Sequence, residues 1–403
     1  MPSLPHLLKF LYTKSSVACA VALLYLCVKY SAKFRAKAIT PEEAQEIIQL
    51  SFMYDMPTLA EYSLAFALFK TYGIPTISKL LLNTKQLASQ ALVARRYADT
   101  GILIATWMSC PLSGRPINAE PGATAHDPRA SIAIARVNWL HSKYKISNED
   151  YLYTLGLFAF EPATWAARYG WRSLSPLEQY ASFICWSEVG RKMNIKNIPS
   201  TAEEFQAWLL AYEEEHMVPA QSNHDVAKYT MDEILFMVPE TLGLRSFFEG
   251  ITRCLLQDRT RIAMMQPEAP KYAKYLIKGT LGLLAFTERY LLLPRRKPLA
   301  PVPIDLPQIE SESAPRFHPI RYTSKPWYKP RRRGLGFLLD RFQVLIGMHD
   351  DVPGPEYKCE GYRIHEVGPL RFEQEGHEQV MKMAAELQGC PVPDAWKPSK
   401  TAL

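Results

Sequence analysis

One helix-start signal recurs along this chain and limits its fold more than any other feature. In it a serine or threonine precedes an acidic residue by three positions, so that the two side chains can satisfy free N–H groups around the first helical turn. The pairs are Thr40 with Glu43, Ser147 with Asp150, Ser175 with Glu178, and Ser200 with Glu203. Apolar residues after these starts recur at helical spacing, whereas no run alternates over the length of a strand. We therefore predict an all-α helical bundle.

The segment of residues 130–144, ASIAIARVNWLHSKY, is predicted to be the central helix. Asp127 and Pro128 favour a helix start there, since aspartate can accept hydrogen bonds from free N–H groups and proline is tolerated in the first turn. The apolar spacing places His141 on the buried stripe of this helix. Arg136 lies five residues earlier, roughly 140° away around the helix axis, so the two side chains should not lie side by side.

Residues 1–37 are predicted to be a membrane anchor with a basic flank. The uninterrupted apolar part, residues 15–28, is shorter than the roughly 20 residues of a spanning helix, so a span requires Lys14 to reach toward the headgroups. Basic residues are more frequent after this run than before it, which predicts a cytosolic body by the positive-inside rule. The alternative is a cleavable signal peptide, which would leave unpatterned cysteines in an oxidising compartment.

Charge and cysteine content limit the partners of the protein. The formal net charge of +7 comes largely from basic runs within residues 29–37 and 295–333, which flank the predicted body. This placement favours a membrane surface over nucleic acid. The seven cysteines are scattered, with no CxxC pair and no CxxCH haem-attachment motif. Their pattern argues against a disulfide scaffold and a zinc site, and it favours a reduced compartment.

We divide the chain into four predicted segments. They are the anchor and basic flank (1–37), a helical domain (38–295), a linker rich in proline and arginine (296–334), and a C-terminal helical extension (335–403). The long loop of residues 110–128 could form a pocket wall. The apolar helix expected at residues 272–293 contains basic residues, which suits a core or interfacial helix better than a second membrane span.

Histidines are the remaining route to a metal or haem, because the chain has no HExxH, GxSxG, Walker, GxGxxG or P450-type cysteine motif. A neutral imidazole on an apolar helical face is a common proximal ligand of haem. Only His141 lies on a predicted buried stripe; the alternative is a core histidine bonded to a backbone carbonyl. His216 and His224 rank second and His126 lower. Four further histidines are expected to be solvated: His318, His349, His365 and His377.

Glu161 is a candidate general base. It precedes Pro162 in a predicted helix, and a buried carboxylate beside a cofactor could accept a proton. The alternative is an exposed glutamate at a proline kink. Three other acidic residues lie near arginines and are expected to form structural ion pairs: Asp99, Glu188 and Asp258.

Several segments together carry a family resemblance. They are FALFKTYGIPTISKLL (66–81), RRYADT (95–100), RVNWLHSKY (136–144), DYLYTLGLFAFEP (150–162), WRSLSPLE (171–178), Trp186 with Val189 and Gly190, YEEEHMVP (212–219) with Asn223, and DRTRIAMM (258–265). In these segments the chain resembles the fungal ER-bound oxygenases of the MpaB type, from the mycophenolic acid pathway. That family is distantly related to the catalytic domain of the latex-clearing rubber oxygenases. The resemblance covers roughly residues 40–295, and no single motif is diagnostic.

The resemblance implies a globin-like all-α fold, haem b as cofactor, and cleavage by O2 of a C=C bond in an isoprenoid or polyketide-derived substrate. The Arg-x-x-x-x-His pattern of the core helix falls on Arg136 and His141, which makes His141 the inherited iron ligand. Arg136 would stabilise charge on oxygen or pair with a haem propionate. A pocket for the lipophilic substrate would be lined by Trp139, Phe158, Phe160 and Met264. The rubber oxygenases differ in having lysine and threonine where this chain has Trp139 and Leu140, and a proximal histidine in the helix that here reads LYTLGLFAF.

These expectations add up to a single-pass enzyme of the ER membrane whose catalytic body faces the cytosol. Its partners would be O2 and a lipophilic small molecule. Two alternatives stay open at the level of sequence. One is a non-haem iron oxygenase, and the other is a non-catalytic helical scaffold that binds a lipid or a pathway partner at the ER.

Overall fold

The computed structural model describes residues 39–85, 90–115, 126–235, 238, 244–307, 314–320, 325–346 and 351–398. The predicted anchor, His349 and the middle of the predicted pocket-wall loop lie outside these residues. No helix within the described ranges is both long and apolar enough to cross a membrane.

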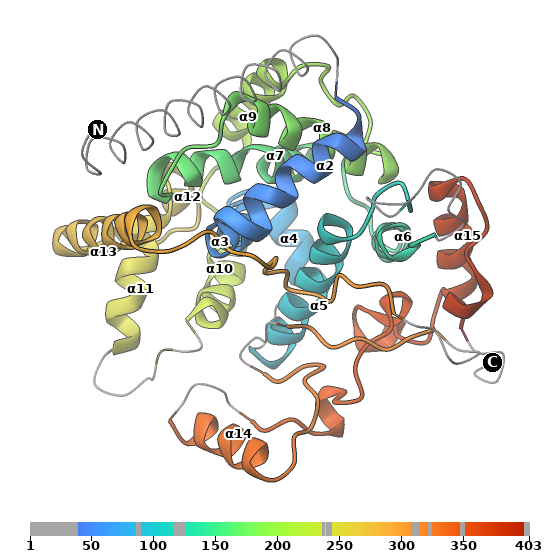
Figure 1. The fold of residues 1–403 in the computed structure, drawn as a ribbon. Coiled ribbons are helices and arrows are strands. Elements are labelled where there is room, and N and C mark those ends of the chain that lie inside the picture. Colours follow the sequence, from blue (N-terminus) through green and yellow to red (C-terminus); the bar gives the residue numbers. More distant parts are fainter. Residues whose placement is uncertain are drawn as a thin grey trace, which may run out of the picture.

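Helices make up the described part of the fold, as the sequence predicts (Figure 1). The α-helices are α2 (Pro41–Gln49), α3 (Pro57–Thr71), α4 (Pro75–Asn83), α5 (Gln90–Ser109), α6 (Arg129–His141), α7 (Asn148–Tyr169), α8 (Pro176–Lys192), α9 (Ala202–His216), α10 (Gln221–Ile234), α11 (Leu244–Leu255), α12 (Asp258–Ala263), α13 (Lys271–Tyr290), α14 (Leu335–Leu345) and α15 (His377–Gln388). Between α2 and α3 lies a π-helix, η1 (Leu50–Asp55), and four short 3-10 turns follow α14: η3 (Pro355–Tyr357), η4 (Ile364–Glu366), η5 (Leu370–Phe372) and η6 (Asp394–Trp396). The described residues form no β-strand, only an isolated antiparallel bridge between Phe317 and Tyr362.

Three of the four predicted helix starts are confirmed. Thr40 with Glu43 and Ser175 with Glu178 form reciprocal capping boxes, and the Ser147 hydroxyl accepts a hydrogen bond from the Asp150 N–H. The fourth prediction, Ser200 with Glu203, is wrong by one position. Thr201 is the N-cap residue and accepts a hydrogen bond from the Glu204 N–H at 3.2 Å, while the Ser200 hydroxyl donates to the Glu204 carboxylate. Two adjacent hydroxyl residues each satisfy the spacing rule, and the backbone uses the second.

Helix α6 is the central helix, as expected. It begins at Arg129, directly after Pro128, and the Asp127 carboxylate accepts a hydrogen bond from the Arg129 N–H at 3.1 Å. Eleven of its thirteen residues are buried. Its alanines let the neighbouring helices approach closely, with α5 on one side and α15 on the other (Figure 1).

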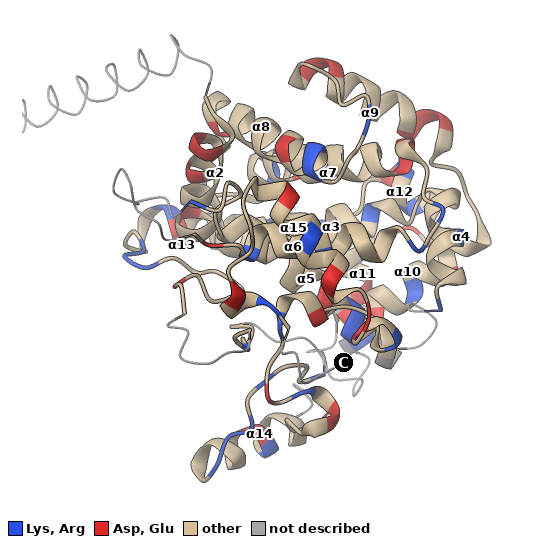
Figure 2. Ribbon diagram, turned by 90° about the vertical axis from the view of Figure 1, so that its right-hand side faces the viewer, with Lys and Arg blue, Asp and Glu red and all other residues tan. Residues whose placement is uncertain are grey.

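The other helices surround this centre. Helix α3 packs along α7, α2 packs on α8, and α7 also contacts α8 and α9. Helix α10 packs against α4 and α5. Helix α14 projects from the rest of the molecule, which Figures 1 and 2 show from two directions.

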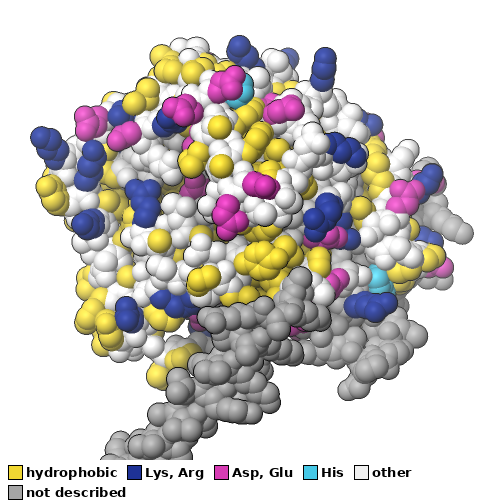
Figure 3. Space-filling view, turned by 90° about the horizontal axis from the view of Figure 1, so that it is seen from above, with side chains coloured by type: hydrophobic (Ala, Val, Ile, Leu, Met, Phe, Trp, Pro, Cys, Tyr) yellow, Lys and Arg dark blue, Asp and Glu magenta, His cyan; other side chains and the backbone are white. Residues whose placement is uncertain are grey.

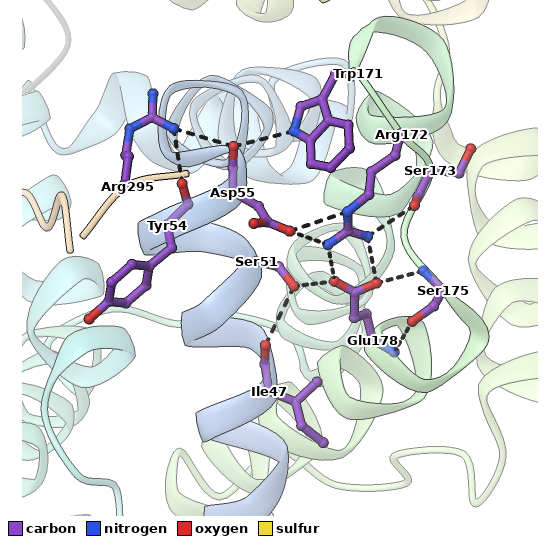
Figure 4. A network of polar contacts seen from close by, with 10 residues as sticks. All are labelled: Ile47, Ser51, Tyr54, Asp55, Trp171, Arg172, Ser173, Ser175, Glu178 and Arg295. Atoms are coloured by element: carbon purple, nitrogen blue, oxygen red, sulfur yellow. Dashed lines mark hydrogen bonds and ion pairs between the residues drawn. The ribbon is translucent and has the colours of Figure 1, made fainter. Parts of the chain in front are cut away.

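The WRSLSPLE segment docks α8 onto the π-helix η1 (Figure 4). The Glu178 carboxylate accepts hydrogen bonds from Arg172, from the Ser175 N–H at 2.7 Å and from the Ser51 hydroxyl. Arg172 also forms an ion pair with Asp55 at the end of η1. Burial acts to raise the pKa of Glu178, whereas the hydrogen bonds from Arg172, Ser51 and Ser175 act to lower it. The hydrogen bonds have the larger combined effect, and the pKa falls to about 2.

The described residues that follow α13, called the returning chain below, first contact the body at η1. The Arg295 guanidinium donates to the Tyr54 carbonyl at 2.9 Å (Figure 4), and the Leu299 N–H donates to the Met53 carbonyl at 2.9 Å. Here an arginine and a backbone amide from a distant segment bond to carbonyls of this π-helix.

The predicted linker and C-terminal extension share a hydrophobic core with the body. Side chains from both segments belong to the same buried cluster as those of α6: Phe317, Tyr328, Ile364, Val367, Val380, Met381 and Trp396. The boundaries predicted at residues 295 and 334 therefore do not separate independent cores. The expectation that His365 is solvated is wrong, because η4 packs against α6 and leaves His365 only 2% exposed.

Candidate functional site

Arg136, the inherited oxygen or propionate partner, lies in the centre of the molecule. It is fully buried, and each of its three guanidinium nitrogens donates to a backbone carbonyl. The acceptors are Val367 at 2.9 Å, Phe372 at 2.7 Å and Glu375 at 2.8 Å. Burial lowers the pKa of Arg136 to about 10, so the guanidinium stays charged at neutral pH.

Two more buried arginines hold the returning chain in the same way. Arg129 donates to the carbonyls of Pro303, Ile304 and Asp305, and Arg95 donates to the Gly368 carbonyl and the Glu373 carboxylate. The planar guanidinium offers several N–H donors in a fixed fork, which suits it to binding irregular backbone. Arginines of α5 and α6 thus fasten residues 303–305 and 367–375 to the helical body.

Beside Arg95, the carboxylate of Asp99 is buried between α5 and the returning chain. It accepts hydrogen bonds from the Tyr328 hydroxyl at 2.6 Å and from the Arg95 Nε at 3.4 Å. Burial raises the pKa of Asp99 to about 6, although Arg95 and Tyr328 act to lower it. The expected ion pairs of Glu188 and Asp258 are present as well, each with a nearby arginine.

His141, the inherited iron ligand, is the last residue of α6 and is half-buried. The prediction that it lies on the buried stripe is wrong in this respect, because the stripe ends where the helix ends and Ser142 caps it. Its ring lies beside Tyr151, with centroids 5.6 Å apart, and its Nδ1 atom is buried without a hydrogen-bond partner. Burial lowers the pKa of His141 to about 4, so the imidazole is neutral. A neutral imidazole with a free nitrogen has the chemistry of a metal ligand.

The second-rank histidines do not join His141 in a metal centre. His216 is half-buried at the end of α9, its ring 4.3 Å from that of Tyr212, and His224 lies in the first turn of α10. Across the described ranges, no group of three or more histidine, cysteine, aspartate or glutamate side chains is arranged to hold a metal ion.

The four expected pocket residues are packed inside the core. The Phe158 ring stacks on Trp186 at 4.7 Å between centroids, and Phe160 stacks on Phe183 at 6.5 Å. Trp139 belongs to the same cluster, whereas Met264 lies in a separate cluster with Phe66 and Trp165. The structure therefore does not bring these four residues together around a cavity.

Two small cavities lie elsewhere, where the returning chain meets the body. One is bordered by Cys110, Arg129 and Phe317, the other by Tyr328 and Glu373, and neither has room for a water molecule. Pockets for small-molecule ligands are typically about 300–1,000 Å³. Neither cavity borders His141 or Glu161.

The residues present do not fit the haem site that the resemblance implies. The Arg136 nitrogens already bond to the backbone of the returning chain, so the guanidinium is not directed at a propionate. His141 stands at the end of α6 beside Tyr151 rather than above a cavity. Trp139 packs against Phe372 and Phe158 stacks on Trp186, and neither side chain borders the two cavities described above.

Glu161 lies in a buried polar cluster formed by α3, α7 and α9. The Lys70 ammonium is 3.0 Å from the Glu161 carboxylate and 2.7 Å from the Glu213 carboxylate, and the Tyr153 hydroxyl donates to Glu213 at 3.2 Å. All four residues are buried, so the alternative of an exposed Glu161 is wrong. Burial raises the pKa of Tyr153 well above its usual value, which keeps the phenol a hydrogen-bond donor.

This Lys70–Glu161–Glu213–Tyr153 cluster is the strongest candidate for proton chemistry in the described part of the chain. It sets one cationic side chain against two acidic ones in a region with little water. Uneven charge of this kind is costly to bury and often marks a functional site. The sequence pointed to Glu161 but not to Lys70 or Glu213, although Lys70 is a lone charge in the apolar run FALFKTYG.

Comparison with known proteins agrees with the resemblance. Residues 80–285 match the family described as ER-bound oxygenase mpaB/B'/Rubber oxygenase, catalytic domain. The chain is 32% identical to ER-bound oxygenase mpaB' of Penicillium brevicompactum over 378 residues, covering 87% of this chain and 83% of that protein. It is 33% identical to ER-bound oxygenase mpaB of Penicillium roqueforti (strain FM164), over 57% of this chain and 78% of that protein. Identity to the mpaB protein of Penicillium brevicompactum is 36% over about half of each chain.

Proposed function

Because the chain belongs to the ER-bound oxygenase mpaB/B'/Rubber oxygenase family, we propose that it is a membrane-anchored oxygenase of fungal secondary metabolism. The substrate is a lipophilic isoprenoid or polyketide-derived molecule, and the reaction is oxidative cleavage of a C=C bond by O2. Similarity over 87% of this chain and 83% of a relative named ER-bound oxygenase is the observation that carries the proposal. The aligned region is longer than residues 80–285, the part of the chain that matches the catalytic domain of the family.

The proposed reaction needs no external reductant. The C=C bond breaks, the O–O bond of one O2 molecule breaks, and each former alkene carbon forms a C=O bond with one of the two oxygen atoms. Four electrons leave the two carbons and reduce O2, so atoms and electrons balance.

We propose that Glu161 is the general base of the site, which takes a proton from the substrate as oxygen adds and returns it as the two carbonyl products form, so that the overall balance is unchanged. Lys70 and Glu213 are its positioning residues. The ion pairs to Lys70 support this assignment, since they fix the carboxylate in one orientation within a dry environment. A substrate must reach this cluster from the membrane side or from solvent through movement of the surrounding helices. No step is assigned to haem, because Arg136 and the packed aromatic residues do not form its site.

His141 is the residue that we propose as a ligand if iron takes part in a form other than haem. Its neutral imidazole has a buried, unpartnered Nδ1, which supports the assignment. Iron analysis of the full chain with His141→Ala, compared with His216→Ala, tests it. Loss of iron is expected from the first variant alone, and equal iron content in both variants would place the ligand elsewhere.

The proposed anchor is residues 1–37, in a single pass through the ER membrane with the body in the cytosol. The relatives are named ER-bound, which supports association with that membrane. Anchoring keeps such an enzyme close to a lipophilic substrate that is dissolved in the bilayer.

A labelled-oxygen experiment tests the activity. Membranes containing the full chain are supplied with a prenylated aromatic compound under 18O2, and the masses of the products are measured by mass spectrometry. One 18O atom is expected in each of two carbonyl products, measured at once to limit exchange with water. Absence of both products, with a well-folded chain, would favour the second candidate, a non-catalytic lipid-binding scaffold. The expected pocket residues pack into the core and leave no substrate site among them, and this is the observation that favours a non-catalytic role.

A further inference from the structure

Helix α13 is exposed along almost its whole length. Of its twenty residues only Ala273 is buried, and the helix extends outward from the body (Figure 1). A surface helix of a water-soluble domain normally covers an apolar stripe against the core. Helix α13 therefore has apolar side chains that the rest of the described chain does not cover.

The apolar exposure is greatest at the C-terminal end of α13 and in the turn beyond it. Large exposed side chains there are Leu283, Leu284, Phe286, Tyr290, Leu291, Leu292 and Leu293, with exposed fractions from 53% to 90%. At about 100° per residue, Leu283, Leu284 and Phe286 fall within an arc of about 160° on one side of the helix. A one-sided apolar stripe of this kind is the arrangement by which a helix lies in a membrane interface.

The N-terminal half of α13 is attached to the body. Its Tyr272 ring stacks on Phe247 of α11, with centroids 6.2 Å apart and planes at 12°, and its Lys274 lies 3.3 Å from Glu268. The apolar half beyond Gly279 therefore lies between two attachments, because Arg295, just after the helix, bonds to the Tyr54 carbonyl of η1.

Basic residues border this apolar end. They are Lys271, Lys274 and Lys278 at the start of the helix, Arg289 near its end, and Arg296 and Lys297 just after it; Glu288 is the acidic residue between them. From above, hydrophobic side chains mix with Lys and Arg along the left edge of the molecule, the side toward which α13 extends in Figure 1 (Figure 3). Helix α9, by contrast, carries acidic residues at both ends (Figure 2).

Apolar side chains on a helix bordered by lysine and arginine are typical of helices that lie in a membrane interface. The basic residues complement the negative surface of the cytoplasmic leaflet. Helix α13 is not long and apolar enough to span a bilayer, which leaves the interface as the lipid environment that its composition suits.

We propose that the C-terminal half of α13, with Leu291 to Leu293, inserts into the headgroup and upper acyl region of a membrane containing anionic lipids. This contact is separate from the predicted anchor at residues 1–37 and orients the body on the membrane. It does not depend on oxygenase activity, so an inactive chain can still show it.

A fluorescent reporter of polarity tests the insertion. An environment-sensitive fluorescent amino acid is incorporated in the full chain at Leu284, at Leu292, or at Leu210, which is 66% exposed on the acidic helix α9 and serves as the control. The protein is reconstituted in phosphatidylcholine vesicles with and without phosphatidylserine, and in matched vesicles with brominated acyl chains. Circular dichroism checks that each labelled chain is folded.

At Leu284 and Leu292 we expect emission at shorter wavelength and loss of more than half of the intensity to the brominated lipid, both larger with phosphatidylserine. At Leu210 emission should stay water-like. Water-like emission at all three positions would overturn the proposal and leave the predicted anchor unaffected. A shift at Leu284 that grows with protein concentration but is not quenched by brominated lipid would also overturn it, and would assign the surface to a second copy of the chain.

Discussion

At the scale of single residues, variants of Lys70 and Glu161 distinguish a structural role of their charged cluster with Glu213 from a catalytic role. Lys70→Met should lower the free energy of unfolding by about 3–5 kcal/mol, because it leaves two buried carboxylates without their cation. Glu161→Gln should change it by less than about 1 kcal/mol, since Lys70 keeps Glu213 as its partner. Chemical denaturation of both variants measures the difference.

The same Glu161→Gln variant tests the proposed base. Product formation should fall by about 10²–10⁴-fold while stability is retained. Glu188→Gln is the matched control, since Glu188 pairs with Arg191 on the surface of α8. A folded Glu161→Gln protein with normal turnover would remove Glu161 from the chemistry.

His365 should make the fold sensitive to acid. Burial lowers its pKa to about 3, and His377, Arg363, Arg136 and Arg316 act in the same direction. Below about pH 6.5 His365 is protonated in the unfolded chain but stays neutral in the folded chain. The free energy of unfolding therefore falls as the pH drops toward 3. In His365→Gln this dependence should be weaker by about 1.4 kcal/mol per pH unit across that window.

Denaturation at a series of pH values checks the effect of His365. Asp99 contributes the opposite slope between about pH 4 and 6, because its raised pKa lets the folded chain hold a proton longer than the unfolded chain. That contribution is shared by both proteins and cancels in their difference. Parallel curves would show that His365 does not titrate differently in the two states.

At the scale of elements, α15 carries a glycine at each end, and the two make a matched pair. Gly376 and Gly389 have φ of +75° and +74°, so alanine is strained at either position. A Cβ atom at Gly376 would lie 2.0 Å from the Trp139 ring, whereas at Gly389 it would meet nothing within 4 Å. Gly376→Ala should therefore cost about 1–3 kcal/mol more than Gly389→Ala.

Thermal denaturation of the two glycine variants provides the measurement, and limited proteolysis shows where the chain loosens. Cleavage within the returning chain should increase in Gly376→Ala alone, because α15 packs on α6 through this contact. Equal losses of stability in the two variants would show that backbone strain, and not the Trp139 contact, determines the cost.

At the scale of the whole molecule, the helical body and the returning chain should fold as one unit. A fragment of residues 38–295 would expose the buried face of α6, including Trp139 and Leu140, and would leave Arg136 without its three carbonyl partners. It should bind hydrophobic dyes and lose near-ultraviolet circular dichroism, whereas residues 38–403 should not. Cooperative unfolding of the shorter fragment would show that the body has an independent core.

The sequence by itself determined the local structure of this protein. Capping chemistry and helical spacing act within a few residues, so the starts at Thr40, Ser147 and Ser175 and the burial of the central helix could be predicted without a fold. Sequence similarity likewise identified the oxygenase family.

Only the tertiary structure decided which partners the key side chains meet. A local pattern makes Arg136 look cofactor-directed and His365 look solvated, but both are buried where η4 and the residues after it pack against α6, more than two hundred residues away from Arg136 in sequence. Lys70, Glu161 and Glu213 come from three separate helices, and no spacing rule links them. The contacts that place these groups join residues far apart in sequence, and periodicity along the chain carries no information about such contacts.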